Sequence, residues 1–284
     1  MIRTAALAAA VAVCAACGAG ARDATRSRLH CSGMGRPAVI LEAGLDATHS
    51  AWRSVQPTLA RRMKTCSYDR LRGRRTANAD LRDLHGLLMR RHVRTPYVLV
   101  GHSFGGMLAY LYATRYRRDV SGLVLVDSEA PWQKRAFLVA LGRPRRGEAA
   151  VARRLRAFLS RPQRNGEGID VDRTFAEARS AGRLGQLPLV VIQAGLENNE
   201  ALPPRLKFLL DRTWFVLQTR LADLSAQHIH VVAATSGHDV IAASGQPELV
   251  VAAVEAVAAS VREHRPLPSC SDAFAQFAAQ CVSG

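Results

Sequence analysis

The stretch VLVGHSFGGMLAY, residues 98–110, places a serine between two glycines, where an apolar run meets a helical pattern. A strand that enters Gly-x-Ser-x-Gly and leaves as a helix must turn sharply, which exposes the central side chain above the strand end. Gly101 and Gly105 lack the Cβ atom that would clash in such a turn. The helix that begins at Phe104 directs its first N–H groups toward the serine. We therefore predict that Ser103 is presented as a reactive side chain.

Short apolar runs alternate with helical patterns from Pro37 to His264, which is typical of parallel strands joined by crossover helices. The predicted strands are AVILEAG, KTCSYDR, PYVLVGHS, VSGLVLVDS, PLVVIQAG and HIHVVAATSG, and the predicted helices cover residues 50–62, 76–91, 104–117, 205–225 and 247–264. The expected fold class is α/β, a mostly parallel twisted sheet with helices on both faces.

The alternation of strands and helices stops between Glu129 and Leu187, where prolines, glycines and arginine-rich helical stretches follow one another. We predict a helical cap insertion over 129–187, which divides the core into 28–128 and 188–264. The tail, 265–284, is expected to be a disulfide-tied extension and not a domain. The arginines of 143–164 are expected to form a solvated helix face, with recognition of an anionic substrate group or a membrane surface as the alternative.

The composition limits the classes of partner. The net charge is +16, from 39 Lys and Arg against 23 Asp and Glu. Because the arginines are scattered and aromatic residues make up only 6%, we predict no nucleic-acid partner. An anionic membrane or cell-envelope surface is the neighbour that such a charge favours.

Residues 1–21 are predicted to be a signal peptide, because Arg3 precedes an apolar run that ends among small residues. The run is too short for a spanning helix, which needs about 20 apolar residues. Two cleavage sites compete. Residues 19–21 form a small-x-small site, whereas residues 15–18 resemble a bacterial lipobox that would make Cys17 a lipidated residue. We expect an exported protein, either a cell-envelope lipoprotein or secreted.

Four further cysteines remain in an exported chain, and an even number suggests disulfides. We predict the pairs Cys31–Cys66, beside neighbouring strands, and Cys270–Cys281, across a short terminal loop. Buried free thiols are the alternative. No CxxC pair and no Cys/His spacing supports zinc, so we predict no metal.

A serine needs a base to become a nucleophile, and the base needs a group that orients it. His238 is the best candidate for the base. It follows the last predicted strand in a small-residue turn, ATSGHDV, and would emerge at the same end of the sheet as Ser103. We interpret His102 as a packing or supporting residue.

The motifs GHSFGG, YDR, GLVLVDS and SGHDV, in this order, resemble the α/β-hydrolase fold superfamily over residues 28–264. The resemblance implies an oxyanion hole made by the backbone N–H groups of Phe104 and Leu45. It also implies that Tyr68 to Arg70 support the loop that carries Leu45, and we expect Asp69 to pair with Arg70. No organic cofactor is implied.

The acid of the triad has two candidates. Asp127 ends the strand after Ser103, and pancreatic lipases of this superfamily take their acid from that strand end. Most relatives take it from the next strand, which here ends in IQAGLENN, so that Glu197 is the alternative acid. We favour Asp127.

The resemblance implies an exported serine hydrolase, carboxylesterase-like or lipase-like, that cleaves small-molecule esters through an acyl-enzyme on Ser103. Two alternatives stay open: an acyltransferase with the same triad, and an inactive envelope binding lipoprotein of the same fold. Dehalogenases and epoxide hydrolases of this fold carry an aspartate where Ser103 stands, which disfavours both activities.

Overall fold

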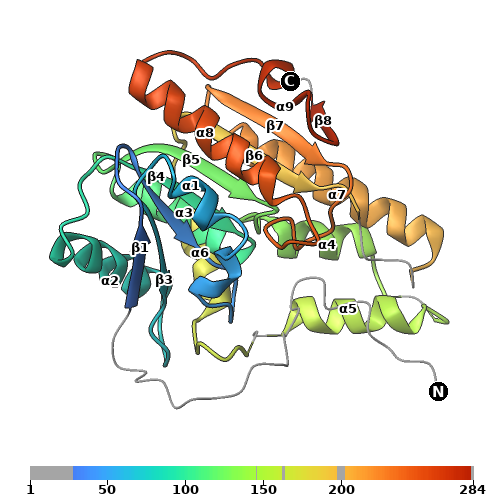
Figure 1. Ribbon diagram of the computed structural model, residues 1–284. Helices are drawn as coiled ribbons and strands as arrows, with labels where there is room; N and C mark the ends of the chain where they lie inside the picture. Colours follow the sequence, from blue (N-terminus) through green and yellow to red (C-terminus); the bar gives the residue numbers. More distant parts are fainter. Residues whose placement is uncertain (1–27, 145, 162–163, 197–201, 283–284) are drawn as a thin grey trace.

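The computed structural model describes residues 28–144, 146–161, 164–196 and 202–282, and it contains one eight-stranded sheet (Figure 1). The strand order is β1-β3-β2-β4-β5-β6-β7-β8. The strands are β1 Arg28–Ser32, β2 Ala38–Glu42, β3 Thr65–Asp69, β4 Tyr97–His102, β5 Val120–Val126, β6 Leu189–Ala194, β7 His228–Ala233 and β8 Ala279–Val282. The neighbours from β3 to β7 are parallel, and the two edge strands are antiparallel. The predicted fold class is confirmed.

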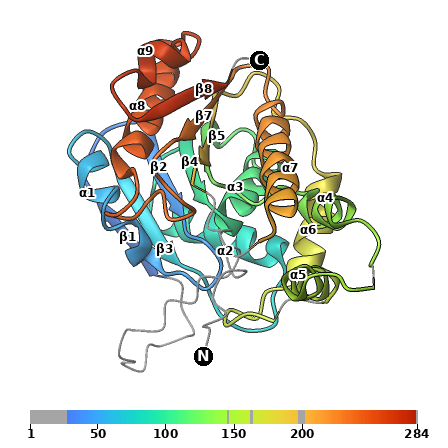
Figure 2. The same cartoon turned by 90° about the vertical axis from the view of Figure 1, so that its right-hand side faces the viewer.

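Helices cover both faces of the sheet, because successive strand residues point to opposite sides. Val39 and Val98 face α1 Gln56–Leu59 and α8 Pro247–Glu263, whereas Ile40 and Leu99 face the other layer. That other layer contains α2 Ala77–Arg90, α3 Phe104–Arg115, α6 Val171–Ser180 and α7 Pro204–Ala222. Figure 2 shows α1 and α8 on one side of the strands and α7 on the other. The central parallel strands are therefore buried on both faces, which explains the apolar runs in β2, β4, β5 and β6.

Four of the five predicted helices lie within a few residues of α2, α3, α7 and α8. The single helix expected over 50–62 is wrong. That segment contains a 3₁₀ turn, η1 His49–Trp52, and the one-turn helix α1, separated by a bend. Pro57 explains the break, because proline has no N–H to donate and its ring clashes with a preceding helical turn, so it suits only a first turn.

Both edge strands were missed by the sequence analysis. β1 precedes Pro37, where the alternation was expected to begin, and pairs antiparallel with β3. The tail forms the short helix α9 Cys270–Phe274 and then β8, which pairs antiparallel with β7. Phe274 is fully buried in the layer that contains α8. The tail is thus part of the sheet and of its core.

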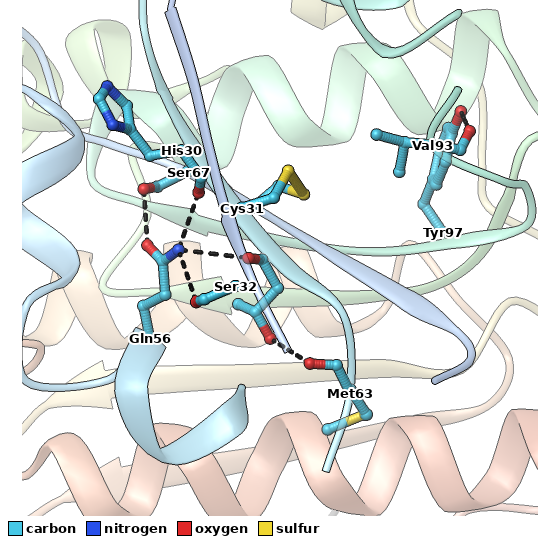
Figure 3. Close-up of a disulfide and its surroundings, with 10 residues drawn as sticks. His30, Cys31, Ser32, Gln56, Met63, Ser67, Val93 and Tyr97 are labelled. Atoms are coloured by element: carbon cyan, nitrogen blue, oxygen red, sulfur yellow. Dashed lines mark hydrogen bonds between the residues drawn. A yellow bond between two sulfur atoms is a disulfide. The ribbon is translucent and has the colours of Figure 1, made fainter. Parts of the chain in front are cut away.

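Both predicted disulfides are present. Cys31 and Cys66 face each other in the β1–β3 ladder, with Cα atoms 4.0 Å apart, and Cys270 joins Cys281 with Cα atoms 5.9 Å apart. Figure 3 shows the Cys31 disulfide beside a polar cluster around Gln56. The Gln56 amide donates 2.8 Å to the His30 carbonyl, and its oxygen accepts 2.6 Å from Ser67. Covalent and polar links therefore both hold β1 against β3.

Replacing Cys31 and Cys66 together with alanine should lower the free energy of unfolding by about 3–4 kcal/mol. The bond closes a loop with a sequence separation of 35, and its loss increases the conformational entropy of the unfolded chain. Urea unfolding followed by circular dichroism would measure the loss. A double variant as stable as the wild type would show that the β1–β3 ladder holds without the bond.

The segment between β5 and β6 contains three helices and no strand among its described residues. These are α4 Gln133–Leu141, α5 Ala150–Ser160 and α6. In the part of the chain that the structure describes, no helix is long and apolar enough to cross a bilayer. The predicted signal peptide and lipobox, with Cys17, lie outside the described residues.

Candidate active site

Ser103 lies at the turn between β4 and α3, as its sequence motif predicts. Its φ of 55° and ψ of −126° are unusual for a residue with a side chain. Such strain persists only where the surroundings enforce it. Here the Ser103 N–H donates 3.0 Å to the Val126 carbonyl, which joins the turn to the end of β5.

Two glycines allow the backbone to approach closely around this turn. A Cβ atom on Gly105 would lie 2.3 Å from the Ala43 carbonyl oxygen, and one on Gly101 would lie 2.5 Å from the Gly105 oxygen. Both distances are shorter than any contact that real Cβ atoms make. The glycines therefore let α3 pack against the end of β2 and carry Ser103 to that edge of the sheet.

His238 and Asp127 meet at the same edge. The His238 Nδ1 atom lies 2.6 Å from Asp127 Oδ2, although the residues are 111 positions apart in sequence. His238 follows β7, and Asp127 follows β5 with a φ of 40°. This left-handed backbone conformation turns the chain as it leaves β5. The structure thus brings the favoured acid and the predicted base into contact.

The pair shifts the pKa values of both groups toward their charged forms. Burial alone would lower the pKa of His238, but the hydrogen bond and the charge of Asp127 outweigh burial and raise it above 6.5. Burial alone would raise the pKa of Asp127, but His238, the Ala194 N–H and Trp214 together lower it below 3.8. Asp127 is therefore ionised, and it stabilises an imidazolium at His238.

Asp127 has further donors that fix its orientation. Its Oδ1 accepts from the Ala194 N–H at 3.0 Å and from the Trp214 indole N–H at 2.9 Å. Trp214 lies on α7 and stacks on Phe137 of α4, with ring centroids 6.1 Å apart. The sequence analysis missed Trp214, since a tryptophan at helical spacing is typical of a core residue. It connects the acid to the segment between β5 and β6.

His102 supports the backbone of His238, as predicted. Its Nε2 atom lies 2.8 Å from the His238 carbonyl oxygen, which can only accept, so His102 donates. Burial, followed by the charge of His238, lowers the pKa of His102 to about 4. A neutral His102 therefore holds the backbone of His238 in place.

The loop of residues 43–48, here called the β2 loop, lies against Ser103. A Cβ atom on Gly44 would lie 3.5 Å from the Ser103 Cβ atom. Within the described residues, the backbone N–H groups of Leu45 and Phe104 donate no hydrogen bond. Both N–H groups are thus free to donate, that of Phe104 directly after Ser103 and that of Leu45 directly after Gly44.

A buried ion cluster holds the β2 loop. Arg70 donates to the carbonyls of Ala43 and Gly44 at 2.6 and 2.5 Å, and it pairs with Glu42 at 2.5 Å and Glu167 at 2.6 Å. Burial raises the pKa of Glu42 to about 7, against the lowering effect of Arg70. The side chain of Arg70 is only 3% exposed, so each contact forms away from water. Arg70 supports the loop, as predicted.

The predicted pair Asp69–Arg70 is wrong. Asp69 is the last residue of β3, and its carboxylate accepts from the His49 N–H at 2.9 Å, away from Arg70. Arg70 pairs instead with Glu42 and with Glu167, which comes from the segment between β5 and β6. Glu167 also accepts 2.7 Å from the Asp46 N–H, and its own N–H donates 2.9 Å to Asp46. Sequence analysis missed Glu167, because a carboxylate between glycines resembles a solvated turn.

Replacing Glu167 with glutamine should lower the free energy of unfolding by about 3 kcal/mol, because it removes one partner from a buried ion pair. Urea unfolding would measure the change. A matched control is Glu263→Gln, since Glu263 is 45% exposed and pairs with an exposed Arg265. The control should change the free energy by about 0.5 kcal/mol or less. Equal effects of both substitutions would contradict the role assigned to Glu167.

Glu129 is a second buried carboxylate that the sequence analysis did not select. It follows Asp127 by two positions and is 7% exposed, and its N–H donates 3.1 Å to the Ser103 carbonyl. Burial raises its pKa to about 7, against the lowering effect of His238. Its Oε2 atom has no hydrogen-bond partner among the described residues. The alternative acid, Glu197, lies outside the described residues.

Known proteins share this arrangement of strands and helices. A thermophilic esterase from Thermogutta terrifontis superposes with a TM-score of 0.53 at 20% identity, over 81% of this chain and 91% of that one. A putative lipase from Acinetobacter baumannii AYE has a TM-score of 0.53 at 13% identity, over 86% and 91%. A protein described as a putative ancestral haloalkane dehalogenase, AncHLD2, has a TM-score of 0.55 at 16% identity, over 84% of this chain and 96% of that one. These identities establish a shared fold.

Sequence comparison leads to the same group. The curated relative YqjL of Bacillus subtilis (strain 168), an uncharacterised protein, is 24% identical over 220 residues, which are 74% of this chain and 80% of the relative. The model of the alpha/beta hydrolase family matches residues 29–259, which include Ser103, Asp127 and His238. This chain belongs to the alpha/beta hydrolase family.

Proposed function

We propose that the protein is an exported serine hydrolase that cleaves carboxylic esters through an acyl-enzyme on Ser103. The observation that carries the proposal is the 2.6 Å contact between His238 and Asp127 at the sheet edge that presents Ser103. An ionised Asp127 accepts a hydrogen bond from the Nδ1–H group of His238, which leaves the lone pair of the ring on Nε2. That tautomer is the one that a serine hydroxyl needs as its base.

The proposed reaction has two halves. Ser103 attacks the ester carbonyl while His238 takes its proton, and the oxyanion that forms accepts from the N–H groups of Leu45 and Phe104. His238 then gives the proton to the leaving alcohol. In the second half, water enters, His238 takes a proton from it, and the water oxygen bonds to the acyl carbon. The bond between that carbon and the Ser103 oxygen then breaks, His238 returns the proton to Ser103, and the released acid ionises to a carboxylate. Asp127 stabilises the imidazolium in both halves.

The similarity to a haloalkane dehalogenase does not extend to the proposed nucleophile. The resemblance places an aspartate in dehalogenases where this chain has Ser103. An ester bond is the substrate class that we assign, in line with the esterase and the putative lipase among the similar structures. The acyl chain length would follow from rates on a series of p-nitrophenyl esters.

A fluorophosphonate probe tests the proposal directly. It should form one covalent adduct, which peptide mass spectrometry should locate on Ser103 and which a Ser103→Ala variant should lack. The absence of an adduct on the wild type would favour the binding lipoprotein instead. For a labelled and active protein, ester products measured with and without added alcohol separate hydrolysis from acyl transfer, since only an acyltransferase would form mainly the new ester.

Export is part of the proposal, and two disulfides support it, because such bonds persist in oxidising compartments. The mass of the mature amino terminus distinguishes the two cleavage sites. A lipidated Cys17 would identify an envelope lipoprotein, whereas a free Arg22 would identify ordinary cleavage. An intact Met1 would contradict export by either route.

A further inference from the structure

Three metal-ligating side chains meet on the face of the β1–β3 pair that packs on η1. His30 lies on β1, Asp69 ends β3, and His49 begins η1. In the antiparallel register His30 is opposite Ser67, so Asp69 is its diagonal neighbour on the same face. Figure 3 shows His30 beside Ser67 on the side of Gln56. One ligand atom from each of the three residues lies within 4.8 Å of the others.

We propose that His30, His49 and Asp69 bind a zinc ion, at a site separate from Ser103. Two imidazole nitrogens and one carboxylate oxygen suit zinc and its neighbours in the transition series, and they do not suit calcium or magnesium. The sequence analysis found no metal site, because three different segments supply these ligands without a recognisable spacing.

The ligand distances are close to those that zinc requires. Ligand atoms about 2.0–2.2 Å from a tetrahedral zinc ion lie about 3.4 Å from one another. His49 Nδ1 is 3.0 Å from both oxygens of Asp69, and His30 Nε2 is 3.7 Å from Asp69 Oδ2. An ion therefore fits after small side-chain movements, with its fourth position open to water.

His30 has a nitrogen without a hydrogen-bond partner. Among the described residues, its Nε2 is buried and unpaired, since 3.7 Å to Asp69 is too long for a hydrogen bond. An unpaired buried nitrogen that faces a carboxylate is the arrangement that a metal ion would satisfy.

One ring must move when zinc binds. The rings of His30 and His49 are stacked, with centroids 3.7 Å apart and planes 11° apart, so both lone pairs cannot point at one ion. Two contacts with Asp69 fix His49 in place, one from its backbone N–H and one from its Nδ1 atom. The side chain of His30 is 39% exposed, and we assign the movement to this ring.

Titration of the untagged full-length protein with zinc chloride, under non-reducing conditions and followed by calorimetry, tests the site. We expect one zinc per chain. The affinity should fall in His30→Gln and in Asp69→Asn by at least the roughly 10- to 100-fold that loss of an outer-shell partner costs, because each variant removes a ligand itself. His92→Asn is the matched control, because His92 is exposed and lies outside the cluster, and it should bind zinc like the wild type. Zinc should also raise the melting temperature of the wild type and of His92→Asn.

A further variant keeps the test valid if the ligand variants fold poorly. Arg28 is the register partner of Asp69 in the β1–β3 ladder, and it lies two residues before His30 on the same strand. Arg28→Gln removes a nearby cation and should tighten zinc binding about threefold or more. Ser103→Ala should bind zinc unchanged, which separates this site from the proposed hydrolase activity. No saturable binding, or equal affinity in His30→Gln and the wild type, would overturn the proposal.

Discussion

A Ser103→Ala variant should lose ester hydrolysis almost completely, with kcat lower by about 10⁶-fold. The proposed reaction begins with attack by the Ser103 oxygen, and no other described hydroxyl occupies the turn between β4 and α3. The residual rate over water should come from the oxyanion donors and from substrate binding alone. Stopped assays on a p-nitrophenyl ester, with enough protein to measure slow turnover, would give the ratio.

Ser244→Ala is the matched control, because Ser244 is exposed in the loop before α8. It should hydrolyse the ester at the wild-type rate. Circular dichroism should show that both variants are folded, since alanine removes a single oxygen atom. A Ser103→Ala variant that retains a tenth of the activity would refute the acyl-enzyme on this residue.

Asp127→Asn should lower kcat by about 10⁴-fold and change the pH dependence. The base must be neutral to take a proton, so kcat/KM falls as the pH drops through the pKa of His238. In the wild type this pKa is raised above 6.5, because Asp127 outweighs the lowering effect of burial. In the variant burial remains and the carboxylate charge is lost, so the acidic limb should move to lower pH.

Asp239→Asn is the control for this prediction. Asp239 adjoins His238, and its charge raises the pKa of His238 less than Asp127 does. Asp239→Asn should change kcat by less than about tenfold and shift the acidic limb of the kcat/KM profile only slightly. A Glu197→Gln variant with the larger loss would instead identify Glu197 as the acid, and Asp127 would then be a structural residue.

The part of the fold that could be predicted has strong local patterns. The runs that became β4, β5 and β6 are mostly apolar, because helices cover both of their faces, and the helix α3 follows its strand directly. The edge strands have no such pattern. β1 is partly exposed and polar, and β8 has only four residues, so their pairing depends on neighbours distant in sequence.

Some residues of the candidate site could likewise be predicted from local sequence patterns, and others could not. Ser103 and His238 follow from turn chemistry and strand order, which a sequence displays. Asp127 was one of two candidates, and the contact with His238 that favours it depends on a φ of 40°, which no pattern reveals. Glu167 and Trp214 were missed, because each acts through a contact with a residue far away along the chain.

The disulfide-tied strand β8 has a consequence for self-association. It covers residues 230–233 of β7, whose outer edge would otherwise present free backbone donors and acceptors to another chain. β8 itself is four residues long and offers a poorer template, and the Cys270–Cys281 bond keeps its end close to α9. Reduction of this bond should therefore first make the protein polymerise. Without the bond β8 can leave β7, and the exposed edge of β7 can then pair with strands of other molecules.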